Sequence, residues 1–205
     1  MLLSIVGIAA SYLLGSVSFS ILMAKWLKKI DIRQHGSGNA GATNTLRVLG
    51  KGPALAVFLL DIAKGVVAVL LGLWLGDGEA WVPVVCGLAA IVGHNWPIFF
   101  HFKGGKGIAT TIGALAVLAI GPAAIAGAAA ILVIALTRYV SLGSIVFVVL
   151  LPFLLAAFGF DSSYLWGSAV IAVLAVYRHR RNIAKLIQGT ENKLGGNKKG
   201  EQHGA

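Results

Sequence analysis

The sequence predicts an all-α, polytopic membrane protein built as a bundle of about seven transmembrane helices. Hydrophobic residues make up 58% of the 205 residues and charged residues only 12%, and the mean hydropathy is +0.86. This composition is too apolar for a soluble domain of the same length. The formal net charge of +10 could suggest nucleic acid, but the basic residues fall in clusters between apolar runs. That distribution indicates membrane topology, with no nucleic-acid partner.

The apolar runs divide the chain into seven expected spans. The fourth, fifth and seventh are shorter than the roughly 20 residues that a transmembrane helix usually needs. Residues 107–137 could form one long broken helix, but two helices that meet at Gly121 and Pro122 agree better with the charge distribution. The expected spans are residues 2–24, 53–75, 81–100, 107–120, 122–137, 142–158 and 164–177.

Charge asymmetry between the connections orients these spans. One set of connections holds Asp77, Glu79 and Asp161 with no Lys or Arg, and only Lys64 lies inside a span. Because basic connections face the cytoplasm, the N-terminus is expected outside and the C-terminus inside. The basic residues of the cytoplasmic side are Lys25, Lys28, Lys29, Arg33, Arg47, Lys51, Lys103, Lys106, Arg138 and those of residues 178–199.

The chain is expected to form one domain. Residues 1–193 are predicted to be a single integral-membrane domain, and residues 194–205 a disordered basic tail, because the tail is polar and contains glycine. The first apolar run has no basic segment before it and no small-residue cleavage site after it, which indicates an uncleaved helix. Cys86 is the one cysteine and is expected to be a small buried side chain.

The first polar break, residues 35–48, has the composition of an anion-binding loop. Its glycines allow backbone amides to point together into a nest, and a short helix over residues 46–51 would follow the loop and offer free amides. A plain turn does not need so many polar side chains. The residues expected to serve the anion are Gly36, Gly38 and Gly41 in the backbone, Ser37, Asn39, Thr43 and Asn44 as short polar groups, and Arg47 as a cation.

The second polar break, residues 101–111, precedes the fourth apolar run. Gly104, Gly105 and Gly107 form the entrance of that predicted helix, where the helix dipole and unpaired amides attract an anion. Lys106 lies between these glycines and is predicted to bind the anion, whereas Lys103 is expected to anchor the chain at the headgroups. Neither break is a nucleotide site. The first has a GxGxxG spacing but follows a membrane helix instead of a strand, and the second fails the P-loop pattern at positions 100 and 107.

Other polar groups leave alternatives open. Asp61 and Lys64 lie three residues apart on one helix face, and ionised groups near the bilayer centre cost on the order of 2.5–3.5 kcal/mol each. They either pair with each other as a structural element or extend the polar site. His94 is expected to be a satisfied hydrogen-bonding residue and not a metal ligand. In residues 178–191, a basic stretch suited to anionic headgroups contains Asn182 and a turn at 189–191, which a simple anchor does not require.

All three polar segments fall on the expected cytoplasmic side, which predicts one shared site. Together these residues resemble the bacterial acyl-phosphate:glycerol-3-phosphate acyltransferase family, often called PlsY. The chain departs from the family pattern at Ser18 and Ser20, where Pro and Gly are expected, and at Lys185, where Arg is usual. The resemblance stops at residue 193. The segments that carry it are residues 15–19, 31–51, 61–65, 93–110, 138–144 and 178–191.

The resemblance implies transfer of a fatty acyl group from acyl phosphate to the 1-hydroxyl of sn-glycerol 3-phosphate. The products are lysophosphatidic acid and inorganic phosphate, in the first acylation step of phospholipid synthesis. It also implies membrane lipid around the bundle and a bacterial inner-membrane location, and the charge distribution places the site on the cytoplasmic side. No cofactor is expected, and no metal, because few carboxylates lie near His94 and His101. Functional coupling to the enzyme that makes acyl phosphate is a further expectation.

The chemistry that the resemblance implies leads to a hypothesis about the roles of the polar residues. Direct attack on a mixed anhydride needs positioning and charge stabilisation, without a covalent enzyme intermediate. The base is left open between His179, His94 and a substrate phosphate oxygen. The catalytic candidates are Lys106, Ser37 and His179, and the substrate-binding candidates are Gly36, Gly38, Asn39, Gly41, Thr43, Asn44, Arg47, Gly104, Gly105, Gly107 and Asn182.

The main competing hypothesis is a transporter for an organic phosphate. Small residues at Gly72, Gly76 and 123–130 would let helices pack closely and slide. A transporter usually places its polar site near the midplane between paired repeats, whereas here the polar segments gather at one face. A non-catalytic scaffold would explain the basic tail but not the glycine-rich breaks. The sequence therefore favours the acyltransferase.

Overall fold

The computed structural model describes residues 1–195, and within them every regular element is a helix. The predicted all-α class is therefore confirmed for the described chain. The predicted tail begins at residue 194, and its residues 196–205 lie outside the described part. The helices are α1 Leu2–Gly15, α2 Phe19–Lys28, η1 Ile32–Gln34, α3 Ala42–Leu49, α4 Lys51–Leu75, α5 Trp81–Asn95, η2 Ile98–Phe100, α6 Ile108–Leu118, α7 Ile120–Thr137, α8 Val140–Ala157 and α9 Ser162–Ile187.

Among residues 1–195, five segments are long and apolar enough to cross a membrane, judged by length and composition: Leu2–Lys28, Lys51–Leu75, Trp81–Phe100, Ile120–Thr137 and Val140–Ala157. The predicted first span is present as two helices, α1 and α2, with a break at residues 16–18. Helix α6 has 11 residues, about 16 Å of rise, which is shorter than the roughly 30 Å hydrocarbon core. Large apolar side chains face outward, including Ile131 and Phe153, which are 68% and 69% exposed.

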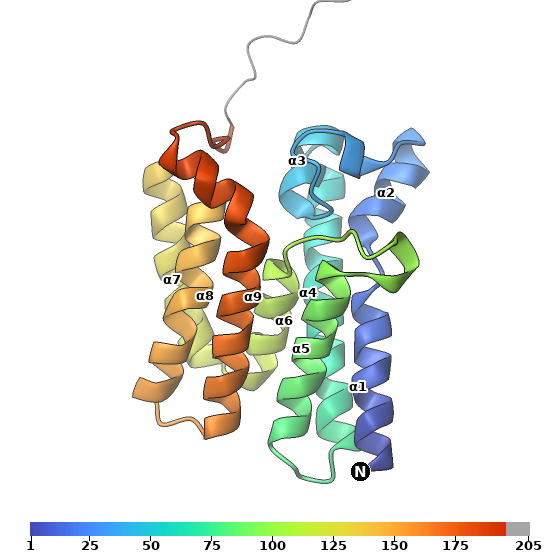
Figure 1. The fold of residues 1–205 in the computed structure, drawn as a ribbon, viewed down its shortest axis with the longest axis vertical. Helices are drawn as coiled ribbons and strands as arrows, with labels where there is room; N and C mark the ends of the chain where they lie inside the picture. The colour runs from blue at the N-terminus through green and yellow to red at the C-terminus, as the bar shows by residue number, and fades with distance from the viewer. Residues whose placement is uncertain (196–205) are drawn as a thin grey trace, which may run out of the picture.

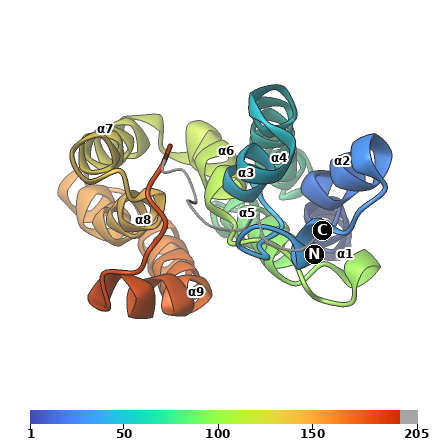
Figure 2. The same ribbon diagram turned by 90° about the horizontal axis from the view of Figure 1, so that it is seen from above.

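The helices form two groups. Helix α4 packs against α1, α5 and α6, and α8 packs between α7 and α9. The two groups meet where α5 contacts α9 and where α6 contacts α7. Figure 2 shows the α7–α8–α9 group beside the α1–α5 group, with α6 between them. The site described below lies between these two groups.

Glycine allows the close helix contacts of this bundle. A Cβ on Gly65 of α4 would overlap the backbone of Thr110 on α6, and a Cβ on Gly113 of α6 would overlap the backbone of Ile62 on α4. Gly15 of α1 approaches Ala90 of α5 in the same way. Because lipid provides no hydrophobic drive for helix association, such close backbone packing contributes van der Waals attraction between the helices.

The two ends of the bundle differ in charge. The N-terminus and the α4–α5 and α8–α9 connections, which carry Asp77, Glu79 and Asp161, lie at one end (Figure 1). Helix α3 and the last turns of α9 lie at the other end. The predicted short helix is α3, which begins at Ala42 and not at residue 46, so Thr43 and Asn44 belong to its first turn. Leu194 is tied to the α7–α8 turn, since its N–H donates to Arg138 O at 2.7 Å.

Candidate active site

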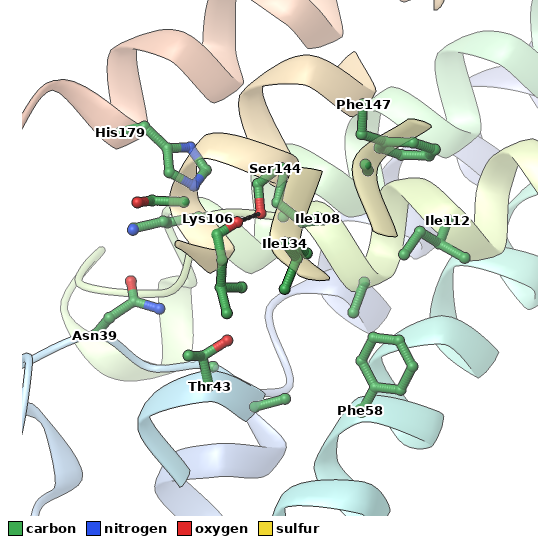
Figure 3. A pocket seen from close by; sticks show the side chains of 18 of the residues that line it. Asn39, Thr43, Phe58, Lys106, Ile108, Ile112, Ile134, Ser144, Phe147 and His179 are labelled. Carbon is green, nitrogen blue, oxygen red and sulfur yellow. Dashed lines mark hydrogen bonds between the residues drawn. The ribbon is translucent and has the colours of Figure 1, made fainter. Parts of the chain in front are cut away.

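A cavity of about 440 Å³ lies between the two helix groups. Helices α3, α4, α5 and α6 line one side, and α7, α8 and α9 line the other. The cavity has two chemically different parts (Figure 3). Asn39, Thr43, Lys106 and His179 lie around one part, and Phe58, Ile112 and Phe147 lie around the other.

Lys106 supplies a cation to the polar part. Its Nζ donates a hydrogen bond of 2.6 Å to Oδ1 of Asn182 on α9. The pKa of Lys106 is lowered to about 8, mainly by burial; the negative charge of Glu191 opposes this lowering, and the positive charge of Arg47 contributes to it. Desolvation disfavours the charged form of an amine. Lys106 therefore remains mostly protonated at neutral pH but is close to titration.

Glu191 fixes the orientation of Asn182. Oε1 of Glu191 accepts hydrogen bonds from Nδ2 of Asn182 at 2.7 Å and from the hydroxyl of Ser141 at 2.9 Å. A carboxylate only accepts, so the amide nitrogen of Asn182 must face Glu191 and its oxygen must face Lys106. The chain Glu191–Asn182–Lys106 thus gives the ammonium one defined position.

His179 lies on α9 beyond the apolar residues 164–177 and is 2% exposed. Its Nδ1 is 2.8 Å from the carbonyl oxygen of Ala175. Because a carbonyl only accepts, the neutral imidazole carries its proton on Nδ1, which leaves an acceptor lone pair on Nε2. Burial lowers the pKa of His179 to about 4, with a further contribution from Lys106. His179 is therefore uncharged at neutral pH.

The first glycine run is held by the side chain of Asn44. Oδ1 of Asn44 accepts from the Ser37 N–H at 2.8 Å, and Nδ2 donates to the carbonyl oxygens of Ile32 and His35. Gly36 has φ +63°, and a Cβ there would overlap Oδ1 of Asn44. Asn44 therefore shapes the loop with both of its amide protons.

Free backbone amides remain where α3 begins. Within residues 1–195, the N–H groups of Asn39, Ala42 and Thr43 donate to no protein group. Gly41 precedes the helix and lines the cavity together with these residues. Unpaired amides at a helix start are suited to a phosphate, and Arg47, in the last turn of the same helix, also lines the cavity.

The second glycine run differs from the expected nest. The N–H groups of Gly104 and Gly105 donate to the carbonyl oxygens of Asn95 and His94 at 3.3 and 3.0 Å, so these two amides are already used within the protein. Their carbonyls accept from Arg178. Within the described residues, the amides of Lys106 and Gly107 make no hydrogen bond, and they precede α6 at the cavity.

The two glycine runs meet. A Cβ on Gly105 would come within 2.5 Å of the carbonyl oxygen of Ala40 in the first run. Arg33 joins the same segments: it pairs with Asp31 and donates to the carbonyl oxygen of Phe100 at 2.9 Å. The side-chain hydrogen bond from Arg33 lowers the pKa of Asp31. The two runs therefore lie in contact, and residues of both, Asn39 and Lys106 among them, line the same cavity.

The sequence matches the family model for glycerol-3-phosphate acyltransferase over residues 5–189. The chain belongs to this acyltransferase family. It is 58% identical over 193 residues to the glycerol-3-phosphate acyltransferase of Halalkalibacterium halodurans, covering 92% of this chain and 94% of that one. It is also 58% identical to that of Shouchella clausii, covering 90% of this chain and 92% of the relative.

Solved structures of the family share the fold. A crystal structure of PlsY, an integral membrane glycerol 3-phosphate acyltransferase, in its glycerol 3-phosphate form is 38% identical, with a TM-score of 0.89 over 94% of this chain and 96% of that chain. The lysophosphatidic acid form is 36% identical, with a TM-score of 0.85, and it covers 94% of this chain and 95% of that chain.

Most of the site residues predicted for this acyltransferase family member line the cavity. Gly36, Gly38, Gly104 and Gly105 do not line it and instead shape the loops around it. The predicted residues that line the cavity are Ser37, Asn39, Gly41, Thr43, Asn44, Arg47, Lys106, Gly107, His179 and Asn182.

Sequence reasoning missed several lining residues. Glu191 had a signal, because it ends the turn that a simple membrane anchor does not need. Ser141 and Ser144 on α8 had none, since single serines in an apolar run are common. Asp61 answers the question left open by the sequence: its Oδ1 lies 2.8 Å from Lys64 Nζ, and it also lines the cavity. Asp61 and Lys64 therefore form a buried ion pair of which only Asp61 reaches the cavity wall.

Proposed function

We propose that this protein transfers a fatty acyl group from acyl phosphate to the 1-hydroxyl of sn-glycerol 3-phosphate. The products are lysophosphatidic acid and inorganic phosphate. One observation carries the proposal: a single cavity joins a cationic, amide-rich part to an apolar part. An acyl phosphate has the same two parts, a phosphate and a hydrocarbon chain. Membership of the glycerol-3-phosphate acyltransferase family supports the acceptor.

The phosphates bind in the polar part. Lys106, with the free amides before α6, holds the phosphate of the donor. Arg47, Ser37 and Asn39, with the free amides at the start of α3, hold the phosphate of the acceptor. Charge-assisted hydrogen bonds of this kind are roughly twice as strong as neutral ones. Two separate groups of donors on facing loops support two anionic ligands at once.

The acyl chain lies in the apolar part, against Phe58, Ile112, Ile134 and Phe147. Because lipid tails are as apolar as this wall, the chain gains little free energy on leaving the bilayer, and the wall instead directs the chain toward the polar part. Small residues on α7, among them Ala123 and Gly127, also line this part. A Cβ on Gly127 would meet nothing within 4 Å, which leaves room for a chain.

The chemical step is a direct acyl transfer. The 1-hydroxyl oxygen attacks the acyl carbonyl carbon, the new ester C–O bond forms, and the C–O bond to phosphate breaks. The phosphate leaves with the electron pair, beside Lys106. The hydroxyl proton passes to Nε2 of His179, which presents the lone pair described above. Positioning and charge stabilisation supply the acceleration, because the mixed anhydride already has a good leaving group.

Acyl phosphate is a better fit as donor than an acyl thioester. Acyltransferases that use thioesters on glycerol phosphate have a His-x4-Asp dyad. In this sequence the residues five after His35, His94, His101 and His179 are Ala40, Phe99, Lys106 and Ala184. No carboxylate follows any of these histidines at that spacing.

The proposal includes the topology of the chain. Seven spans cross a bacterial inner membrane, with α1 to α2 as the first, α6 as a short fourth and the apolar part of α9 as the last. The N-terminus lies outside, and the basic end with the cavity faces the cytoplasm. The cavity then faces the cytoplasm, the side on which the substrates are made. The enzyme that makes acyl phosphate is a functional partner.

A reconstituted assay tests the function. Protein purified in detergent is incubated with palmitoyl phosphate and glycerol 3-phosphate, and lysophosphatidate and released phosphate are measured. The two products are expected to form in equal amounts. A parallel reaction with palmitoyl-CoA tests the donor. We expect turnover with palmitoyl phosphate as the donor and none with palmitoyl-CoA. Turnover only with palmitoyl-CoA would refute acyl phosphate as the donor. In a separate experiment with the protein reconstituted in vesicles, uptake of intact glycerol 3-phosphate without any product would favour the transporter.

A further inference from the structure

His94 lies in the cavity wall but has no part in the proposed chemistry. It occupies the last turn of α5 and is 6% exposed. Its two ring nitrogens have different surroundings. Nδ1 faces a buried charged pair, and Nε2 faces the place where the two glycine runs meet.

Lys64 determines which ring nitrogen carries the proton. Nζ of Lys64 makes three hydrogen bonds, all of 3.0 Å, to Gly15 O, Val17 O and His94 Nδ1. An ammonium has three protons and accepts none, so Nδ1 of His94 accepts from Lys64 at 3.0 Å, while Oδ1 of Asp61 lies farther from Nδ1, at 3.4 Å. The neutral imidazole therefore carries its proton on Nε2. Asp61, with Oδ1 at 2.8 Å from Nζ, balances the charge of Lys64.

The position of Lys64 is fixed by the break between α1 and α2. Helix α1 ends at Gly15 and α2 begins at Phe19, so the carbonyls of Gly15 and Val17 are free to accept from Nζ. The ring of Phe19 lies 5.6 Å from Nζ. Lys64 is 2% exposed and is therefore shielded from bulk solvent. The tautomer of His94 is thus set by the fold.

Nε2 of His94 lies against the second glycine run. A Cβ on Gly105 would overlap this nitrogen, so only glycine allows the imidazole to approach here. Within residues 1–195, Nε2 makes no hydrogen bond. His179 is the opposite case, with its proton on Nδ1 and a lone pair on Nε2. The cavity therefore has one histidine that accepts and one that donates.

We propose that His94 is a further substrate-binding residue, which donates its Nε2–H to a phosphate oxygen of acyl phosphate or of glycerol 3-phosphate. This inference rests on the proposed function, because it assigns a ligand group within the same cavity. A neutral N–H donor next to Gly105 and Lys106 adds direction without adding charge. It also removes His94 from the choice of base, since the nitrogen that faces the ligand already holds a proton.

Two substitutions separate binding from structure. His94→Asn keeps a polar group near Nδ1 and loses the one at Nε2, whereas His94→Gln places an amide N–H near the position of Nε2. KM and kcat are measured with acyl phosphate and glycerol 3-phosphate varied in turn. We expect His94→Asn to raise KM for one of the two substrates by about tenfold to a hundredfold, as for loss of a hydrogen bond to a charged group. His94→Gln should recover most of that loss.

The substrate whose KM rises identifies the phosphate. His101→Asn is the matched control, because His101 is exposed and does not line the cavity. Equal KM values for wild type and both His94 variants would overturn the proposal, as would an equal loss in both. A wild-type protein without turnover would instead refute the proposed function, so the two failures are distinct.

A spectroscopic measurement on the wild-type protein does not depend on whether the variants fold. Nitrogen-15 NMR of histidine-labelled protein reports which ring nitrogen holds the proton. We expect the His94 signal to show the proton on Nε2 and to shift when glycerol 3-phosphate or a non-reactive acyl phosphonate is added. A proton on Nδ1, or an Nε2 signal that responds to neither compound, would refute the assignment.

Discussion

Lys106 and Asn182 are 76 residues apart in the sequence, and their side chains meet in a hydrogen bond of 2.6 Å. This contact joins the loop before α6 to the end of α9, across the boundary between the two helix groups. Asn182 is in turn held by Glu191 at 2.7 Å. The cation of the cavity is therefore positioned by segments that come together only in the folded bundle, and its removal should affect catalysis more than stability.

Lys106→Ala should reduce kcat/KM by about a hundredfold or more, because about 3 kcal/mol of electrostatic stabilisation is lost. Lys103→Ala is the matched control: Lys103 lies in the same loop but is exposed and does not line the cavity. Both variants are assayed in detergent after a check of membrane insertion. Near-normal turnover of Lys106→Ala would contradict the assigned role.

The activity should fall in alkaline solution. The pKa of Lys106 is lowered to about 8 by burial, so the amine is protonated below that pH and neutral above it. Anion binding needs the protonated form, and kcat/KM of the free enzyme should therefore decline as pH rises through about 8. Lys106→Arg keeps its charge at higher pH and should lack this decline. The check is a pH profile of both proteins between pH 6 and pH 10.

Glu191→Ala should lower kcat by about tenfold to a hundredfold, since Asn182 loses the partner that orients it and a small misplacement in an active site can cost this much. Ser141→Ala removes the other hydrogen bond to the same carboxylate oxygen and leaves Asn182 in place. Its kcat should stay within about threefold of wild type. Equal losses in the two variants would show that Glu191 acts through α8 and not through Asn182.

Gly36→Ala should destabilise the protein more than Gly189→Ala. Both glycines have positive φ, +63° and +69°, so both variants carry the left-handed strain of about 1–2 kcal/mol. Only at Gly36 does the new Cβ overlap Oδ1 of Asn44, whereas at Gly189 it meets nothing within 4 Å. Breaking the Asn44 bonds adds about 1–3 kcal/mol. Thermal unfolding in detergent measures the difference, and equal melting temperatures would contradict the role of Asn44.

The sequence predicted the helical class because apolar composition and helix formation are local properties. A chain with 58% hydrophobic residues must pair its backbone polar groups within each helix to lie in lipid. The division of residues 107–137 into two helices was also predictable, but its position was not: the break lies at Ala119, and Gly121 and Pro122 belong to the first turn of α7. The division of residues 2–24 into α1 and α2 was not predictable, because the carbonyl oxygens that it frees, those of Gly15 and Val17, accept hydrogen bonds from Lys64 on another helix.

The candidate site was predictable in part. Residue types determined that the runs 35–48 and 101–111 attract anions, since glycine, short polar side chains and a lysine have that tendency in any fold. Which amides remain free was decided by tertiary contacts: Gly104 and Gly105 donate to the end of α5, and Asn44 binds its own loop. The roles of the two histidines depend on the partner of a single ring nitrogen in each, Ala175 in one case and Lys64 in the other. Sequence sets which groups can donate or accept, but only the folded structure sets which of them meet, because a hydrogen bond depends on distances of a few tenths of an ångström.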